Sequence, residues 1–287
     1  MTGNGGRLRK SGVFGADFWL RTLSGSVLGI GALVLTWMDG WAFSILAAVI
    51  AALVLREWRR LIGIEQSPIV AVAALAIAFA AVLAAHAFGA GAAGIVSLVL
   101  AAAAAVHAAV TSERAAVPWA AAGVFYAIIP AVAMQSLRGA NASGLAAVLF
   151  VFAVVWSTDV CAYLAGRAIG GPRLLAVISP KKTWSGAVGG FGGAIAAALV
   201  VGLLAGVPHI WPLIGLAGIA SVVAQAGDLF ESWIKRHFSV KDSGGLIPGH
   251  GGVMDRVDGL VAAATFLAVI GWIHSGAGDA ADGILIW

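Results

Sequence analysis

The chain has 287 residues, of which 61% are hydrophobic and 10% charged, and its formal net charge at pH 7 is +4. A mean hydropathy of +1.00 excludes an ordinary soluble domain. The single cysteine, Cys161, excludes an intramolecular disulfide framework and a cysteine metal cluster, so packing is its expected role.

Nine apolar segments follow one another along the chain. A helix needs about 20 apolar residues to cross roughly 30 Å of hydrocarbon, so these segments predict an all-α, polytopic transmembrane bundle of about nine spans. They cover residues 22–38, 41–55, 68–87, 91–110, 116–135, 143–166, 184–206, 211–227 and 258–275. The first segment lacks an Ala-x-Ala-like cleavage site, which favours a retained helix over a cleaved signal peptide. The 39 glycines suit close approach of helices in lipid.

We expect a single membrane domain with a polar arm and two unequal halves. The arm covers residues 1–20, a transmembrane scaffold covers 21–142, and a catalytic region covers 143–287, where the longest polar loops fall. In the scaffold, Glu57 at the end of the second span is interpreted as an interfacial anchor. The histidines of this half, of which His86 is one, are expected to be packed or interfacial groups.

The basic residues predict the orientation of the chain. When successive loops are assigned to alternate sides, 16 of the 17 basic residues fall on the side of the N-terminus, and Arg138 falls opposite. The positive-inside rule then places the N-terminus in the cytoplasm and, with an odd number of spans, the C-terminus outside. Because the basic residues follow topology, a pI near 9.6 does not indicate a nucleic-acid partner.

A carboxylate stands inside the sixth apolar segment. Asp159, Tyr163 and Arg167 are spaced four residues apart, so they share one face of a helix. An ionisable residue within a span is by default a functional hypothesis, and this face leads toward the cytoplasmic mouth. The structural alternative is that Asp159 caps or pairs with another helix.

A short basic motif precedes the seventh apolar segment. Ser179, Lys181, Lys182 and Thr183 surround Pro180, which disfavours helix before it and predicts a loop. Two lysines, two hydroxyls and the start of a helix form a candidate cradle for phosphate. Anchoring of the chain by positive charge is the alternative.

Three further carboxylates flank the most polar loop. Asp228 is predicted to end one span, while Asp255 and Asp258 begin the next. Carboxylates from two neighbouring helix ends are suited to hold a hard cation, which prefers oxygen ligands.

The loop between these carboxylates combines glycine with basic side chains. Residues 248–252 include His250, Gly251 and Gly252, and the glycines allow backbone N–H groups to approach an anion. The cations that can neutralise phosphate oxygens are Lys235, Arg236, Lys241 and Arg256. Together these parts indicate phosphoryl or nucleotidyl transfer. The alternative is a solvated loop with incidental salt bridges.

The segment from Ser232 to Asp258 resembles a known family pattern. It reads Ser-x2-Lys-Arg-x4-Lys-Asp-x-Gly-x2-Ile-Pro-Gly-His-Gly-Gly-x2-Asp-Arg-x-Asp, which is similar to the signature of phosphatidate cytidylyltransferases, or CDP-diacylglycerol synthases. The motifs at 159–167 and 179–183 resemble further blocks of that family, in the same order. Ser185 and Gly259 depart from it, because the family often has Glu and Ser there.

The resemblance implies a membrane enzyme of phospholipid biosynthesis that forms CDP-diacylglycerol and diphosphate from CTP and phosphatidate at the cytoplasmic face of a bacterial-type inner membrane. It implies magnesium on Asp228 and Asp255, with Asp159 as a third candidate and room for a second cation. Catalytic roles would fall to Asp228, Asp255, Lys241 and Arg256. Substrate-binding roles would fall to Ser179, Lys181, Lys182, Thr183, Lys235, Arg236, His250, Gly251 and Gly252. Membrane lipids are expected partners, nucleic acid is not, and a homodimer is left open.

Four other functions remain as alternatives. A lipid-alcohol kinase, or a CTP-dependent synthase acting on an ether lipid, would need the same anionic-lipid chemistry. A CDP-alcohol phosphotransferase is disfavoured, since its Asp-Gly-x2-Ala-Arg pattern is absent. An ion-coupled transporter could use Asp159, but transport does not require the glycine-rich basic loop.

Overall fold

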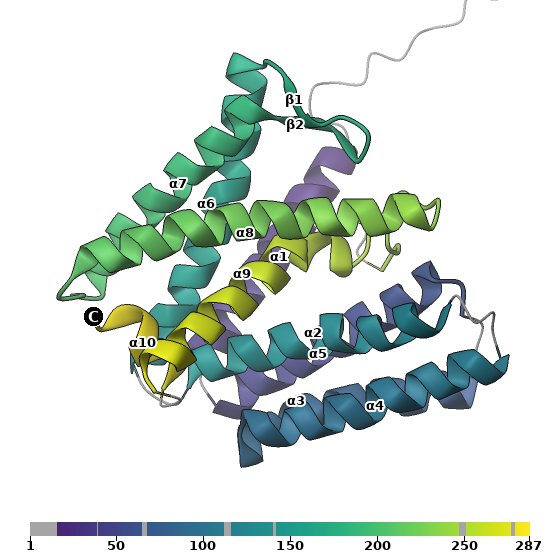
Figure 1. Ribbon diagram of the computed structural model, residues 1–287. Coiled ribbons are helices and arrows are strands. Elements are labelled where there is room, and N and C mark those ends of the chain that lie inside the picture. The colour runs from purple at the N-terminus through teal and green to yellow at the C-terminus, as the bar shows by residue number, and fades with distance from the viewer. Residues whose placement is uncertain are drawn as a thin grey trace, which may run out of the picture.

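The computed structural model describes residues 16–38, 40–64, 68–111, 116–139, 142–246, 251–276 and 279–287. Within these ranges the chain forms ten helices and one two-stranded hairpin (Figure 1). The helices are α1 (Ala16–Met38), α2 (Gly40–Leu61), α3 (Pro68–Phe88), α4 (Ala90–Thr111), α5 (Val117–Arg138), α6 (Ala142–Ile169), α7 (Trp184–Leu204), α8 (Ile210–His237), α9 (Met254–His274) and α10 (Ala280–Leu285). The strands are β1 (Arg173–Leu175) and β2 (Ser179–Thr183).

The predicted all-α membrane bundle is confirmed. Each of the nine apolar segments coincides with one of the helices α1 to α9. Within the described ranges, seven helices contain stretches long and apolar enough to cross a membrane, and α1 and α4 carry the shorter apolar stretches Leu23–Met38 and Gly94–His107. The short C-terminal helix α10 was not predicted.

Two polar segments are more ordered than the sequence suggested. The segment after residue 227 was expected to be loop, but α8 continues to His237. Basic residues in its last turn, including Lys235 and Arg236, favour the continuation because they complement the negative end of the helix dipole. The segment before α7 was also expected to be loop, but β1 and β2 pair antiparallel there.

Helices α6 and α7 pack at unusually short range through glycine. A Cβ atom added to Gly190 would lie 2.8 Å from the carbonyl oxygen of Thr158, and one added to Gly193 would lie 2.6 Å from the Cys161 sulfur. Side chains would separate the two helices, so the glycines allow backbone contact of the kind found in membrane bundles. The close pair carries the β1–β2 hairpin at one end (Figure 1).

Helix α9 joins the two halves of the molecule. Its first turn, with Met254 and Val257, belongs to a core shared with α2, α3 and α5. Its later residues, among them Ala264 and Leu267, belong to a second core shared with α6, α7, α8 and α10. Figure 1 shows α9 between α8 and the α2–α5 pair. The start of α9 therefore lies where both halves can contact it.

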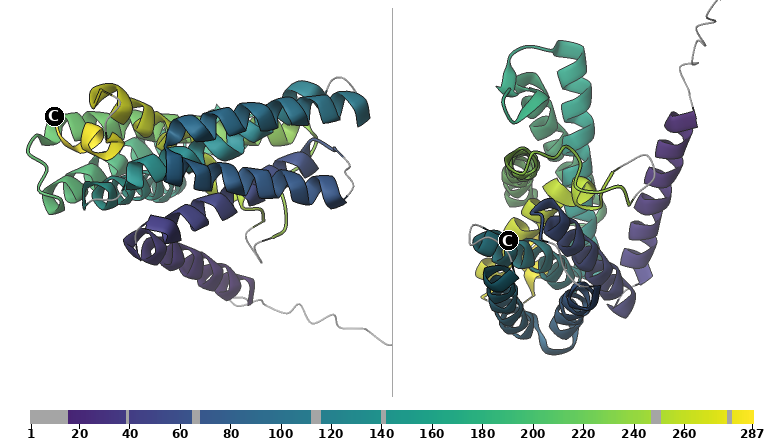
Figure 2. Two further views of the ribbon diagram at one scale, coloured as in Figure 1. Left: turned by 90° about the horizontal axis from the view of Figure 1, so that it is seen from below. Right: turned by 90° about the vertical axis from the view of Figure 1, so that its right-hand side faces the viewer.

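Polar residues of the N-terminal half are packed inside the bundle. The Nδ1 atom of His86 lies 2.9 Å from the Ser44 hydroxyl, and its ring centroid lies 4.3 Å from that of Trp41. This confirms the expected packed role for His86. Arg138 is buried, and its Nε donates to the carbonyl of Thr36 at 2.8 Å, tying α5 to α1. Figure 2 shows α1 along the side of the bundle.

Candidate active site

Three carboxylates from α8 and α9 converge on one point. Asp228 and Glu231 lie one turn apart on α8, and Asp258 lies on the second turn of α9. One oxygen from each of the three carboxylates lies within 4.8 Å of the others. Glu231 was not among the predicted site residues because the helix was expected to end at residue 227. Its i+3 spacing from Asp228 is the signal that would have revealed it.

Lys235 lies between Glu231 of this group and a fourth carboxylate, that of Asp255. Its Nζ is 2.6 Å from Oε2 of Glu231 and 2.7 Å from Oδ1 of Asp255. The Glu231 side chain is 1% exposed and that of Asp255 is 6% exposed. Buried carboxylates need a positive partner, and one ammonium group serves both. This bridge fixes the end of α8 against the start of α9.

Asp255 also holds the loop that precedes α9. Its Oδ2 accepts from the backbone N–H of Ser243 at 3.1 Å and from that of Gly252 at 2.9 Å. Asp255 lies outside the three-carboxylate group, and both of its oxygens are bonded to Lys235 or to this loop. The sequence predicted a cation held by Asp228, Asp255 and Asp258, and the family resemblance implied Asp228 and Asp255 as its ligands. The structure groups Asp228 with Glu231 and Asp258.

The basic motif before α7 reaches the same place. Lys182 on β2 forms an ion pair with Asp228 on α8. Thr183 caps α7, because its hydroxyl accepts from the backbone N–H of Gly186 at 3.1 Å. Ser185, which replaces a glutamate frequent in the related family, donates to the carbonyl of Gly170 and so closes the base of the hairpin. Two segments predicted separately are thus brought together.

The remaining members of this motif differ in accessibility. Lys181 is exposed and Ser179 is half-buried on β2.

Asp159 lies on α6 with an exposed side chain. It interacts electrostatically with Asp228, Lys182 and Arg256, but it is not part of the three-carboxylate group. The predicted shared face is confirmed one turn further along, where Nη1 of Arg167 donates to the Tyr163 hydroxyl at 2.8 Å.

Three predicted cations lie on the elements that carry the carboxylates or on the loop between them. Arg236, Lys241 and Arg256 are exposed, on the last turn of α8, on the loop and on the first turn of α9. Gly251 has a φ of +84°, a conformation that side chains disfavour. His250 lies outside the described residues.

Glu57 corrects one interpretation made from the sequence. It was taken for an interfacial anchor, yet it is 3% exposed and lies against the loop before α9. Its Oε1 accepts from the N–H of Val253 at 2.9 Å, and its Oε2 accepts from the N–H of Met254 at 2.8 Å. Nothing in its local sequence showed this, because the partners lie almost 200 residues away.

The carboxylate group has the composition that a hard cation requires. Oxygen ligands from Asp228, Glu231 and Asp258 suit Mg²⁺, which binds through carboxylates and retained water. Oε1 of Glu231 is buried and has no hydrogen-bond partner among the described residues. A buried carboxylate oxygen left unbonded is costly, and a bound cation would satisfy it. The residues present therefore fit a magnesium ion.

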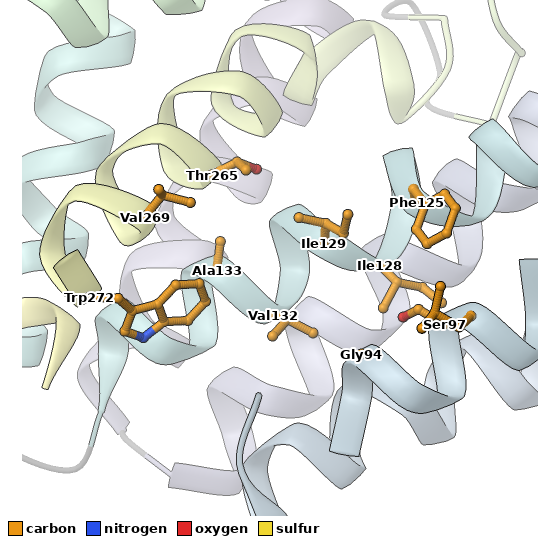
Figure 3. A pocket seen from close by; sticks show the side chains of 11 residues that line it. Gly94, Ser97, Phe125, Ile128, Ile129, Val132, Ala133, Thr265, Val269 and Trp272 are labelled. Carbon is orange, nitrogen blue, oxygen red and sulfur yellow. The ribbon is translucent and has the colours of Figure 1, made fainter. Parts of the chain in front are cut away.

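An apolar cavity lies apart from these charges. It has a volume of about 340 Å³ and is lined by residues of α4, α5 and α9 (Figure 3). The residues that line it are Gly94, Ser97, Leu98, Phe125, Ile128, Ile129, Val132, Ala133, Thr265, Val269 and Trp272. Since no ionisable side chain is among them, its walls match hydrocarbon better than a nucleotide.

The fold and the site together define a polytopic helical membrane protein with a compact cluster of acids and bases at one end of its helices. Residues 19–274 match the model of the cytidylyltransferase family. The chain is 42% identical over 265 residues to a phosphatidate cytidylyltransferase of Brucella suis biovar 1 (strain 1330), covering 89% of this chain and 93% of the relative. It therefore belongs to the cytidylyltransferase family.

Other relatives match over shorter stretches. A phosphatidate cytidylyltransferase of Staphylococcus epidermidis (strain ATCC 35984) is 42% identical over 131 residues, which is 45% of this chain and 50% of the relative. One of Rickettsia bellii (strain RML369-C) is 38% identical over 137 residues, which is 44% of this chain and 58% of the relative.

Proposed function

We propose that this protein is a phosphatidate cytidylyltransferase, which forms CDP-diacylglycerol and diphosphate from CTP and phosphatidate. The observation that carries the proposal is the meeting of Lys182 and Asp228. It joins the candidate phosphate-binding motif to the three-carboxylate group in a chain of this family. Relatives that carry this name cover most of the chain.

The reaction joins two anions. A phosphate oxygen of phosphatidate attacks the α-phosphorus of CTP in line, a new P–O bond forms, and the bond from the α-phosphorus to the diphosphate oxygen breaks. Both electrons of that bond leave with diphosphate. Phosphatidate is already an anionic nucleophile, so no covalent enzyme intermediate and no strong base is required. The main barrier is repulsion between the two substrates, which positive charge relieves.

The basic residues of the chain are placed to supply this charge. Lys182 contacts Asp228 from the hairpin, on which Lys181 also lies, while Arg236, Lys241 and Arg256 are exposed on the end of α8, the loop and the start of α9. We assign binding of the CTP phosphates to the hairpin lysines. We assign neutralisation of the departing diphosphate to Lys241 and Arg256, whose exposed side chains are able to reach solvent-facing oxygens. Lys235 is instead held by two buried carboxylates and fixes α8 against α9.

Asp228, Glu231 and Asp258 would hold Mg²⁺ in this proposal, with Asp255 next to them through Lys235. When bound, the ion supplies charge stabilisation to the reacting phosphates. Asp228 is common to the ligand set expected from the sequence and to the one supported by the structure. Lys182, which neutralises Asp228 here, is then available for a substrate phosphate.

The placement of the site suits a water-soluble and a lipid substrate together. The β1–β2 hairpin and the end of α8 lie at the end of the molecule opposite the C-terminus (Figure 1). We propose that this end faces the cytoplasm of a bacterial-type inner membrane, in accord with its basic residues. CTP then arrives from water while the acyl chains of phosphatidate stay in the bilayer.

The test is CTP turnover by the purified protein in detergent. With phosphatidate and Mg²⁺ we expect CDP-diacylglycerol and an equal amount of diphosphate, and with chelator we expect neither. Diacylglycerol and an ether-linked phosphatidate analogue are the matched controls. Transfer of phosphate from a nucleotide to diacylglycerol would indicate a lipid kinase. Preference for the ether-linked analogue would indicate the CTP-dependent synthase that acts on ether lipids. Absence of CTP turnover with every lipid would refute the proposal.

A further inference from the structure

Glu57, in the N-terminal half, is hydrogen-bonded through both of its carboxylate oxygens. It lies on the last turns of α2, and its two oxygens accept from the N–H groups of Val253 and Met254. Its Oε2 also accepts from the hydroxyl of Ser243 at 3.1 Å. All three donors belong to the segment that runs from the loop after α8 into α9.

Through these bonds, a residue of α2 caps the N-terminus of α9. The first N–H groups of a helix have no partner within the helix and are usually satisfied by the residue at the cap position. Here the cap position is Val253, which has no side-chain acceptor and makes no capping bond. Glu57 takes that role, and its charge matches the positive end of the α9 dipole.

The loop is shaped to admit this carboxylate. A Cβ atom on Gly252 would lie 2.5 Å from Oε2 of Glu57, and one on Gly244 would lie 2.8 Å from Oε1. Either distance is too short for a real contact, so side chains at these two positions would displace Glu57. Both glycines fall within the family signature and are explained by this contact.

Ser243 connects Glu57 to the candidate active site. Its hydroxyl donates to Glu57, while its backbone N–H donates to Asp255, which pairs with Lys235. A chain of bonds therefore runs from α2 through the loop to α9 and α8. It links the N-terminal half, to which the sequence assigned little chemistry, to the carboxylate group.

We propose that Glu57 is a positioning residue. From α2 it fixes the loop around Ser243 and the first turn of α9, and thereby sets the positions of Asp255, Arg256 and Asp258 relative to α8. The inference rests on the proposed function for its effect on turnover, while its effect on the loop is independent of that function.

Glu57→Gln tests the inference with nearly unchanged shape. The amide nitrogen cannot accept a hydrogen bond, so at least one of the three donors loses its partner. We expect kcat to fall on the order of 10- to 100-fold, since misplaced reacting groups carry penalties of that size. We also expect trypsin to cleave faster after Lys241, which lies in the loop. Arg60→Gln is the control, because Arg60 is exposed one turn away on α2. It should alter neither kcat nor the rate of cleavage after Lys241.

Ser243→Ala provides a second, milder variant. It removes one bond to Glu57 and keeps the backbone bond to Asp255, so we expect a smaller fall in kcat. In a Glu57→Gln background it should cost less than it does alone, because the shared bond is already lost. If Glu57→Gln does not accumulate as folded protein, unchanged kcat and cleavage in Ser243→Ala would overturn the inference.

Wild-type kcat together with wild-type cleavage after Lys241 in Glu57→Gln would overturn the inference as well. A uniform rise in cleavage at every site with a lower melting temperature would also overturn it, because that outcome shows a general loss of stability. If the wild-type protein turns over no CTP at all, the proposed function fails. The comparison of cleavage after Lys241 still decides whether Glu57 holds the loop.

Discussion

Lys182 on the strand β2 and Asp228 on the helix α8 form an ion pair, although 45 residues separate them in the chain. The pair connects the α6–α7 unit to the α8–α9 unit at the end where the helices carry their charged side chains. A phosphate group entering the site would compete with Asp228 for Lys182, and a cation would compete with Lys182 for Asp228. We therefore expect the binding of either a phosphate group or a cation to break this ion pair.

Replacing Asp228 with Asn should remove most of the activity. The change takes away a ligand common to both candidate cation sets and leaves Lys182 without its partner. We expect kcat for CDP-diacylglycerol formation to fall about 100-fold or more, the scale seen when a charge-stabilising group is removed from a site. The measurement is initial rate at saturating CTP and phosphatidate, with Arg60→Gln as control. A loss below threefold would contradict the role given to Asp228.

The two candidate cation sets make different predictions for Asp255 and Asp258. Asp258 belongs to the three-carboxylate group, whereas Asp255 is occupied by Lys235 and the loop. If the group is the site, Asp258→Asn should raise the Mg²⁺ concentration for half-maximal activity at least tenfold. Asp255→Asn should then lower kcat while leaving that concentration within about threefold.

The same comparison has a readout that does not depend on turnover. Binding of Mn²⁺ to the purified variants, followed by its electron paramagnetic resonance signal, reports cation affinity directly. Weaker Mn²⁺ binding in Asp255→Asn than in Asp258→Asn would restore the pair expected from the sequence. Near-normal turnover in Asp255→Asn would remove Asp255 from the mechanism altogether.

The bridge made by Lys235 should be important for stability. Lys235→Met leaves Glu231 and Asp255 buried without their shared positive partner. Breaking a buried pair by removing one member costs about 3–5 kcal/mol, so the melting temperature in detergent should fall clearly. Adding Glu231→Gln removes one of the unpaired charges and should recover part of the loss. A double variant less stable than Lys235→Met would argue against the bridge.

The helices were predictable from the sequence, but their ends were not. An apolar run of about 20 residues has few alternatives in a membrane, so the centres of α1 to α9 followed from hydropathy. The end of α8 depends on the Glu231–Lys235 pair and on packing against α9, which hydropathy does not measure. Placing that end at residue 227 hid Glu231.

The site could be predicted only as far as local motifs carry information. Lys182, Asp228, Lys235 and Asp255 stood out as charges in an apolar chain, and the structure shows direct ion pairs among them. The partner of Asp255 and the role of Glu57 depend on contacts across the fold. Glu57 sits among arginines at a helix end, a pattern that is typical of an anchor, and its burial arises from the distant loop alone.

The close contact of α6 and α7 gives a prediction with a matched control one residue away. Gly193→Ala would bring a methyl group to 2.6 Å from the Cys161 sulfur and 2.8 Å from the carbonyl oxygen of Ser157. Gly192→Ala meets no atom within 4 Å. Forcing atoms into a packed interface costs about 1–3 kcal/mol, whereas alanine in place of glycine in a helix gains roughly 0.5–1 kcal/mol.

We therefore expect Gly193→Ala to melt at a lower temperature than the wild-type protein and Gly192→Ala at an equal or higher one. Because α6 and α7 carry the hairpin with Lys182, the first variant should also raise KM for CTP, while the second should leave it unchanged. Equal melting temperatures for the two variants would show that the helices separate without cost. A raised KM in Gly192→Ala would show that the effect on CTP does not come from the helix contact.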